Sequence, residues 1–207
     1  MIGAGKAGLI GAITLASAGT IAGIGYSTGL FNSNTQINEL LKKENKHILL
    51  SSKSGEDTTG WTEAWKKYWK NKVWGEITGS TEDQVPERFK TLCGEKAKES
   101  VYDTKDPKYI NITKFCSRDK TIKDVLNEEG FKFLSETGKD KEWQDKFDNY
   151  KSDQNTLKLP GVTIDQGDTK DKHHNKISKG CVEAVKAKTT DKGYEDNLAA
   201  IRHWCKE

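Results

Sequence analysis

Two stretches of this chain carry aromatic residues at positions i, i+4 and i+7, the spacing that places side chains on one face of a helix. The residues are Trp61, Trp65 and Tyr68 in the first stretch, and Trp143, Phe147 and Tyr150 in the second. Trp69, at i+8, extends the first aromatic face, and lysines occupy the other faces, as in an ordinary amphipathic helix. We predict two helices whose aromatic faces are buried core elements rather than platforms that stack a ligand.

The residues before each aromatic helix also repeat. Apolar residues at i, i+3 and i+4 predict a short helix in each copy, the first from Thr35 and the second from Thr121. They are Ile37, Leu40 and Leu41, then Ile122, Val125 and Leu126. Asn45 and Gly130 follow at the position where a left-handed residue ends a helix. Short apolar runs come next, at residues 48–51 and 131–135, and their periodicity does not decide between a strand and a buried turn.

The residues after the aromatic helices repeat as well. Each copy has an apolar helical pattern around one cysteine and closes on a second cysteine, with apolar residues seven, four and one positions before it. The cysteines are Cys93 and Cys116 in the first copy, and Cys181 and Cys205 in the second. The spacing between matched positions drifts along the chain, which indicates loop insertions within a duplicated domain rather than a short-period solenoid. The pattern predicts a mostly α fold with two tandem small helical modules, residues 35–118 and 119–207, related by internal duplication.

The segment before the modules, residues 1–34, is rich in small and apolar residues, and residues 7–31 hold no charge. As a helix these would extend roughly 37 Å at ~1.5 Å per residue, enough for a bilayer core of ~30 Å. An uncleaved N-terminal hydrophobic helix that anchors the protein in a membrane is our first interpretation. A signal peptide cleaved after Ala16-Ser17-Ala18 is the second, and a buried soluble helix is the third.

Charge changes the picture by excluding one class of partner. Residues 1–34 contain one base, Lys6, and no acid, so the remaining chain holds 34 − 1 = 33 basic and 31 acidic residues. A nucleic-acid-binding domain usually shows a basic surplus or a basic stripe. We therefore expect no nucleic-acid partner.

The four cysteines permit three disulfide connectivities. A module that once stood alone carried only its own two cysteines, so duplication favours Cys93 with Cys116 and Cys181 with Cys205. Four free thiols in a reducing cytoplasm are the competing interpretation. Crossed pairing between modules is the third, and it requires the two copies to dock closely.

Residues with catalytic or metal-binding chemistry are sparse. His173 and His174 lie near Asp168 and Asp171 in a hydrophilic loop of the second copy, which is the pattern of a solvated loop rather than of a metal site. The chain has no C-x-x-C, no HExxH and no EF-hand spacing. We expect no catalytic residue, no metal and no cofactor.

The chain resembles one of the large paralogous families of uncharacterised proteins of haemotropic mycoplasmas. The resemblance rests on the Gly/Ala-rich N-terminal segment, the hydrophobic-Leu-Ser step before a Trp-x-x-x-aromatic-x-x-Tyr helix, the paired cysteines and the Trp204-Cys205 ending. It covers nearly the whole chain. It implies a surface-exposed or secreted antigen on a wall-less cell, with no activity from which a catalytic residue could be carried over.

These patterns together predict an exported surface protein, held in the membrane through residues 7–31, with its body outside the cell. It would act as a binding module for a host protein or cell-surface ligand, or as an antigen, without catalysis. The alternative is a hydrolase or nuclease whose site lies between the two modules and gathers His173, His174 and acids from both copies.

Overall fold

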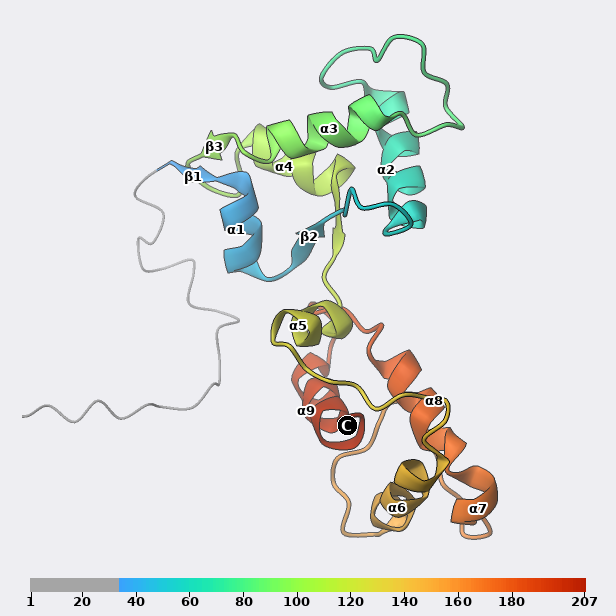
Figure 1. The fold of residues 1–207 in the computed structure, drawn as a ribbon. Coiled ribbons are helices and arrows are strands. Elements are labelled where there is room, and N and C mark those ends of the chain that lie inside the picture. The colour runs from blue at the N-terminus through green and yellow to red at the C-terminus, as the bar shows by residue number, and fades with distance from the viewer. Residues whose placement is uncertain (1–33) are drawn as a thin grey trace, which may run out of the picture.

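The computed structural model describes residues 34–207, and about half of these are helical. The chain is mostly α, with nine helices and four short strands in the described part. The elements form two lobes, which Figure 1 shows one above the other. The first lobe, residues 34–118, contains β1 (Thr35–Gln36), α1 (Ile37–Glu44), β2 (His47–Leu49), α2 (Thr58–Asn71), α3 (Glu87–Lys96), β3 (Ser100–Val101), α4 (Pro107–Phe115) and most of β4 (Ser117–Asp119). The second lobe, residues 119–207, contains α5 (Ile122–Glu128), α6 (Asp140–Lys151), α7 (Lys170–His173), α8 (Asn175–Ala184) and α9 (Tyr194–Trp204).

The predicted N-terminal hydrophobic helix, residues 7–31, lies outside the described residues. No helix among residues 34–207 combines the length and the hydrophobicity that a bilayer crossing requires.

The start of the first lobe differs from the sequence prediction. The helix expected from Thr35 begins at Ile37, because Thr35 and Gln36 form strand β1, which pairs with β3 in antiparallel fashion and sets Thr35 opposite Val101. This pairing joins residues more than sixty positions apart, so the local helical pattern could not reveal it.

The apolar run at residues 48–51 proves to be partly extended. Strand β2 pairs with β4 in antiparallel fashion and sets Leu49 opposite Ser117. In the second lobe the matching run forms one isolated bridge, between Phe133 and Lys206. Tertiary pairing therefore decides what periodicity left open.

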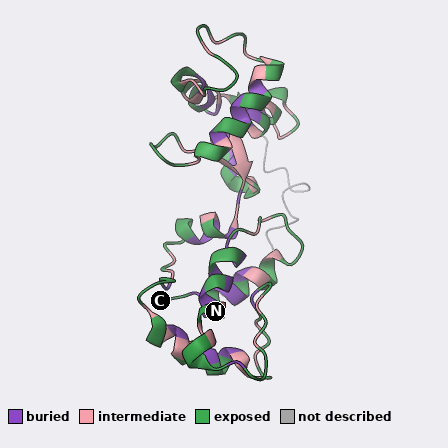
Figure 2. Cartoon of the chain, turned by 90° about the vertical axis from the view of Figure 1, so that its right-hand side faces the viewer, coloured by how far each residue is buried: buried purple, intermediate pink, exposed green. Residues whose placement is uncertain are grey.

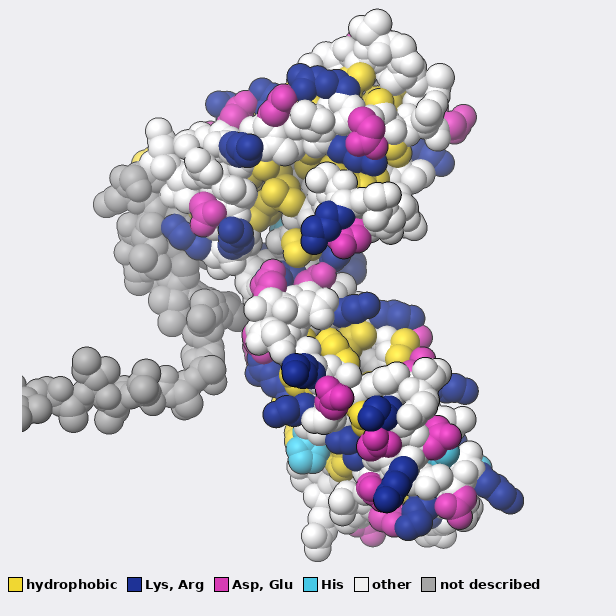
Figure 3. Space-filling view, viewed as in Figure 1, with side chains coloured by type: hydrophobic (Ala, Val, Ile, Leu, Met, Phe, Trp, Pro, Cys, Tyr) yellow, Lys and Arg dark blue, Asp and Glu magenta, His cyan; other side chains and the backbone are white. Residues whose placement is uncertain are grey.

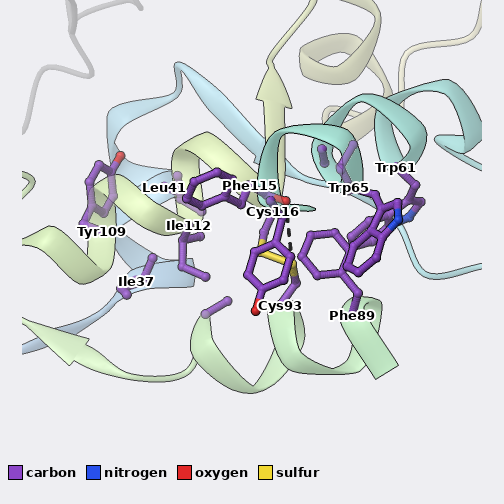
Figure 4. Packing of buried hydrophobic residues seen from close by; sticks show 14 of the residues in the cluster. Ile37, Leu41, Trp61, Trp65, Phe89, Cys93, Tyr109, Ile112, Phe115 and Cys116 are labelled. Atoms are coloured by element: carbon purple, nitrogen blue, oxygen red, sulfur yellow. Dashed lines mark hydrogen bonds between the residues drawn. A yellow bond between two sulfur atoms is a disulfide. The ribbon is translucent and has the colours of Figure 1, made fainter. Parts of the chain in front are cut away.

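Buried hydrophobic residues form two clusters, one from Ile37 to Cys116 and one from Ile122 to Cys205. The predicted module boundary, between residues 118 and 119, falls between the two clusters. Helices of both lobes are buried along one side and exposed along the other (Figure 2). In the first lobe Trp61, Trp65 and Phe89 pack together beside the disulfide (Figure 4).

The same backbone hydrogen bond occurs inside each lobe, at matched positions. At the start of α1 the Ile37 N–H donates to Glu99 O at 3.0 Å, and at the start of α5 the Ile122 N–H donates to Ala187 O at 2.9 Å. Each bond ties the first turn of the lobe's first helix to the segment after the cysteine-bearing helix. The repeated apolar spacing of the sequence thus corresponds to a repeated main-chain contact.

A second matched bond lies beside each disulfide. The Leu50 N–H donates to Cys116 O at 3.0 Å, and the Leu134 N–H donates to Cys205 O at 2.9 Å. The Leu-Ser step of each copy therefore lies against the last cysteine of its own lobe, which places the aromatic helix that follows over the lobe's core.

Candidate functional site

The cysteines pair within each lobe, as the duplication pattern predicted. Cys93 on α3 bonds Cys116 at the end of α4, with Cα atoms 5.5 Å apart, and Cys181 on α8 bonds Cys205 at the end of α9, with Cα atoms 5.7 Å apart. No free cysteine occurs in the described chain. Closing loops of this length contributes ~3 kcal/mol each by restricting the unfolded chain. Disulfides persist in oxidising compartments, so the two bonds are consistent with an extracellular setting.

The six predicted core aromatics are buried, each with 4% or less of its surface exposed: Trp61, Trp65, Tyr68, Trp143, Phe147 and Tyr150. The first tryptophan of each aromatic helix is also fixed by a matched hydrogen bond. The indole N–H of Trp61 donates to Ser51 O at 2.7 Å, and that of Trp143 donates to Ser135 O at 2.8 Å. Rings held in this way fill the core and have no face to offer a ligand.

The hydrophilic segment 165–174, which we call the histidine loop, contains the short helix α7, and its histidines pair with acids of their own lobe only. His173 Nε2 lies 3.4 Å from Asp168 Oδ1, and His174 Nε2 lies 3.5 Å from Asp140 Oδ1. Lys176 also pairs with Asp168, and this hydrogen bond is the main cause that lowers the pKa of the Asp168 carboxyl. The contacts fix the loop against α6 and α8, and they include no acid of the first lobe. Within residues 34–207 no cluster of three or more His, Cys, Asp or Glu side chains is placed to hold a metal ion.

The junction between the lobes is built from ion pairs, centred on Arg118 of β4. Its Nε donates to Asp57 Oδ1 of the first lobe at 2.8 Å, and its two terminal nitrogens donate to Asp124 of the second lobe. Burial alone would raise the pKa of Asp124, but hydrogen bonds from Arg118 and Thr121 outweigh it and lower this pKa to about 2. The paired guanidinium in turn has a pKa above its ordinary value, chiefly through the hydrogen bonds that it donates to Asp124.

A buried lysine forms the second part of the junction. Lys120 is 5% exposed, and its ammonium donates to Asn45 Oδ1 of the first lobe and to Glu128 of the second. Thr189 of the second lobe adds a hydroxyl bond to Asn45 O at 2.8 Å. These groups satisfy one another, so they hold the lobes together and leave no polar atom of Lys120 for a substrate.

One imidazole lies at this junction. His47 Nε2 is 3.7 Å from Asp119 Oδ1, and Lys188 occupies the other carboxylate oxygen at 2.6 Å. His47 Nδ1 is the single buried side-chain polar atom of the described residues that lacks a hydrogen-bond partner. No sequence pattern predicts this arrangement, because its members come from β2, β4 and a loop of the second lobe.

A shallow hollow of about 530 Å³ lies between α6 and the last residues of the second lobe. Its floor includes Leu134 and Trp204, and its rim carries Lys146 and Glu142 among charges of both signs. Burial lowers the pKa of Lys146. The hollow is open to solvent and its rim charges offset one another, so it offers no focused charge to a ligand.

The first aromatic helix ends in a surface that the sequence prediction missed. Trp69 was expected on the buried aromatic face but is only half-buried, with its ring 5.5 Å from that of Trp65. Trp74, three residues after the helix ends, is half-buried and stacks on Tyr68 at 5.5 Å. Val73 between them is 42% exposed. Trp69 is eight residues after Trp61, and the rotation of the helix over that distance turns its side chain away from the core. Trp69 therefore lies at the border of the apolar face.

Comparisons with known proteins place this chain in no group: no family model, no curated protein and no solved structure matches it.

Proposed function

We propose that this chain is an exported surface protein that acts by binding, through two disulfide-stabilised helical modules that arose by internal duplication. The observation that carries the proposal is the presence of one disulfide inside each lobe, linking matched helices. Two such bonds stabilise small cores that must persist outside the reducing cytoplasm. Residues 7–31 supply the membrane attachment in this proposal.

The matched contacts support the duplication. The bonds Ile37 to Glu99 and Ile122 to Ala187 connect the same points of both lobes, although the loops between them differ in length. The two lobes have the same arrangement of core contacts but different surface residues. Such a pair of lobes is compatible with a protein that presents binding faces or antigenic surfaces. On the face shown in Figure 3, basic and acidic side chains are interspersed over both lobes, which agrees with a partner other than nucleic acid.

The alternative of a hydrolase or nuclease with a site between the lobes draws no support from these contacts. His173 and His174 meet acids of the second lobe alone, and the junction groups are engaged in ion pairs that join the lobes.

Accessibility of the body on intact cells tests the proposal. Cells that produce the full chain are treated with trypsin, and in parallel with a membrane-impermeant phosphine followed by a maleimide polymer. Export predicts that trypsin removes the body, and that the polymer shifts the chain only after reduction. A body that resists trypsin until lysis, or that reacts with the polymer in lysates without reduction, contradicts it.

A further inference from the structure

We infer that the surface formed by Trp69, Lys72, Val73 and Trp74, with Lys66 and Lys70 beside it on α2, is a contact site for anionic lipid headgroups. We call it the Trp69–Trp74 surface. It belongs to the body of the protein and is separate from residues 7–31, so the inference stands independently of how the N-terminal segment is used.

The hydrogen bonds of the indole N–H groups distinguish the two tryptophans of this surface from the four in the cores. The indole N–H groups of Trp61, Trp65, Trp143 and Trp204 all donate to backbone carbonyls, at distances of 2.6–2.8 Å. Trp69 and Trp74 make no such bond to any described residue. Trp69 and Trp74 are only half-buried, whereas the other four tryptophans are 5% exposed or less, so these two rings reach the surface of the first lobe. A ring with an apolar body in the protein and a free N–H at the surface is the type of side chain that concentrates at membrane interfaces.

The segment that carries these rings is basic. Residues 66–74 contain Lys66, Lys67, Lys70 and Lys72 and no acid. Lys66 and Lys70 lie three residues before and one residue after Trp69, and both are exposed. The Lys72 ammonium lies 4.6 Å from the centroid of the Trp69 ring and also pairs with Glu76. Because the described chain as a whole is nearly balanced in charge, the exposed Lys66 and Lys70 on either side of Trp69 form a local basic site for an anionic partner.

The geometry of the rings favours a lipid surface over a stacked ligand. The Trp69 face is covered by the Lys72 ammonium, and Trp74 stacks on Tyr68 with an angle of 30° between the rings. Sugars and nucleic-acid bases bind by stacking on an open ring face, whereas a headgroup region accepts ring edges and N–H donors. Val73, exposed just after the left-handed Lys72 that ends α2, presents an apolar tip beside them. Lysine stems can lie along such an interface while their ammonium groups reach lipid phosphates.

The second lobe provides the internal contrast. At the end of its aromatic helix α6, the residue that follows Tyr150 is Lys151, where the first lobe has Trp69 after Tyr68. Lys151 donates to Gln166 O and Asp168 O and thus fastens the histidine loop. The same helix end is therefore occupied in the second lobe and open in the first.

Tryptophan fluorescence of the full chain tests the inference. All six tryptophans lie between positions 61 and 204, so the signal reports on the body whether or not residues 7–31 insert. The chain is mixed with vesicles of phosphatidylcholine that contain about one third phosphatidylglycerol, with or without bromine on the acyl chains near the headgroup. The expected result is quenching by brominated lipid that falls in about 0.5 M NaCl, where charges are screened within a few ångströms.

Two variants locate the contact. W69F/W74F should lose the quenching, because the remaining four indoles are buried. K66E/K70E keeps every tryptophan and should weaken the contact roughly 30-fold or more, since each lysine near an anionic surface contributes about a fivefold share. The matched control K172E/K179E changes the net charge equally on exposed lysines of the second lobe and should quench like the parent chain.

Three results would overturn the inference: no quenching of the parent chain by anionic brominated vesicles, equal quenching of W69F/W74F, or equal quenching of K66E/K70E. A salt-sensitive change of tryptophan emission with soluble heparin or polyuridylate, with no quenching by vesicles, would be a form of the first of these results and would assign the surface to a polyanion. Near-ultraviolet circular dichroism confirms that each variant is folded, and K66E/K70E serves alone if W69F/W74F does not fold.

Discussion

Arg118 and Asp124 meet in a two-bond fork across the junction between the lobes, with Nη1 2.6 Å from Oδ2 and Nη2 2.9 Å from Oδ1. Planar forks of this kind are stronger and more directional than single ion pairs. The same guanidinium holds Asp57 of the first lobe, so Arg118 fixes the last strand of one lobe against the first helix of the other. Asp124 also caps α5 with Thr121.

Asp124→Asn should make the protein less sensitive to acid. The pKa of Asp124 is lowered from 3.8 to about 2 in the folded protein. A carboxyl with a depressed folded pKa stabilises the fold fully above its unfolded pKa, and that contribution is lost as the pH falls from about 4 to about 2. The contribution is about 2 kcal/mol. Denaturant titrations at several pH values should show that the variant loses about this much less stability over that interval.

The control for this prediction is Asp153→Asn, which changes an exposed carboxyl of the second lobe and should leave the pH dependence unaltered. Equal acid sensitivity of the Asp124→Asn variant and the parent chain would show that the fork does not govern the acid response.

The sequence predicted well those features that depend on local spacing. Asn45 and Gly130 end their helices in the left-handed conformation, with φ of 56° and 70°, as their positions after the apolar pattern indicated. The cysteine pairing and the buried aromatic faces followed from the repeat, because matched residues of two copies limit the alternatives.

Features that depend on distant residues were not predictable in this way. The β1–β3 pairing and the bond from Arg118 to Asp57 join residues about sixty positions apart, and no periodic signal links their members. Trp69 was misplaced for another reason: its position at i+8 fits a buried face by spacing, but the core does not extend far enough around α2 to cover it. The surface that carries our further inference therefore became visible only in three dimensions.

Removing either disulfide should cost the protein ~3 kcal/mol of unfolding free energy, because loops closed by 23 and 24 positions restrict the unfolded chain to similar degrees. The variants C93A/C116A and C181A/C205A, compared by thermal melting of the full chain, should each melt well below the parent. Peptide mapping without reductant should recover Cys93 linked to Cys116. A peptide that links Cys93 to Cys181, or unchanged melting of both variants, would contradict the pairing and its energetic role.

Truncating the aromatic faces should unfold the affected lobe. Trp65 and Phe147 are each 1% exposed, and removing a ring of this size from a packed core costs about 3–5 kcal/mol. The variants Trp65→Ala and Phe147→Ala should therefore lose their cooperative melting transition or shift it strongly downward. Ile110→Ala is the matched control, because Ile110 is 48% exposed on α4. The melting temperature of this variant should stay near that of the parent. A loss of stability as large as that of Trp65→Ala would mean that burial does not set the free-energy cost of truncation.

Two helical glycines should respond to alanine in opposite directions. On α3, a Cβ added at Gly94 would meet no atom within 4 Å, so Gly94→Ala gains the helix propensity of alanine and should stabilise the protein by about 0.5–1 kcal/mol. On α8, a Cβ at Gly180 would lie 2.1 Å from Val162 Cγ2 and 3.5 Å from Leu159 Cδ1. Both contacts come from the segment that packs over the second core, so Gly180→Ala should cost about 1–3 kcal/mol through overpacking.

The double variant Gly180→Ala with Val162→Ala should recover part of that loss, because it removes the methyl group that clashes. Denaturant unfolding of all three variants checks the sign of each change, and a Gly180→Ala protein as stable as Gly94→Ala would show that the Val162 segment moves away without cost.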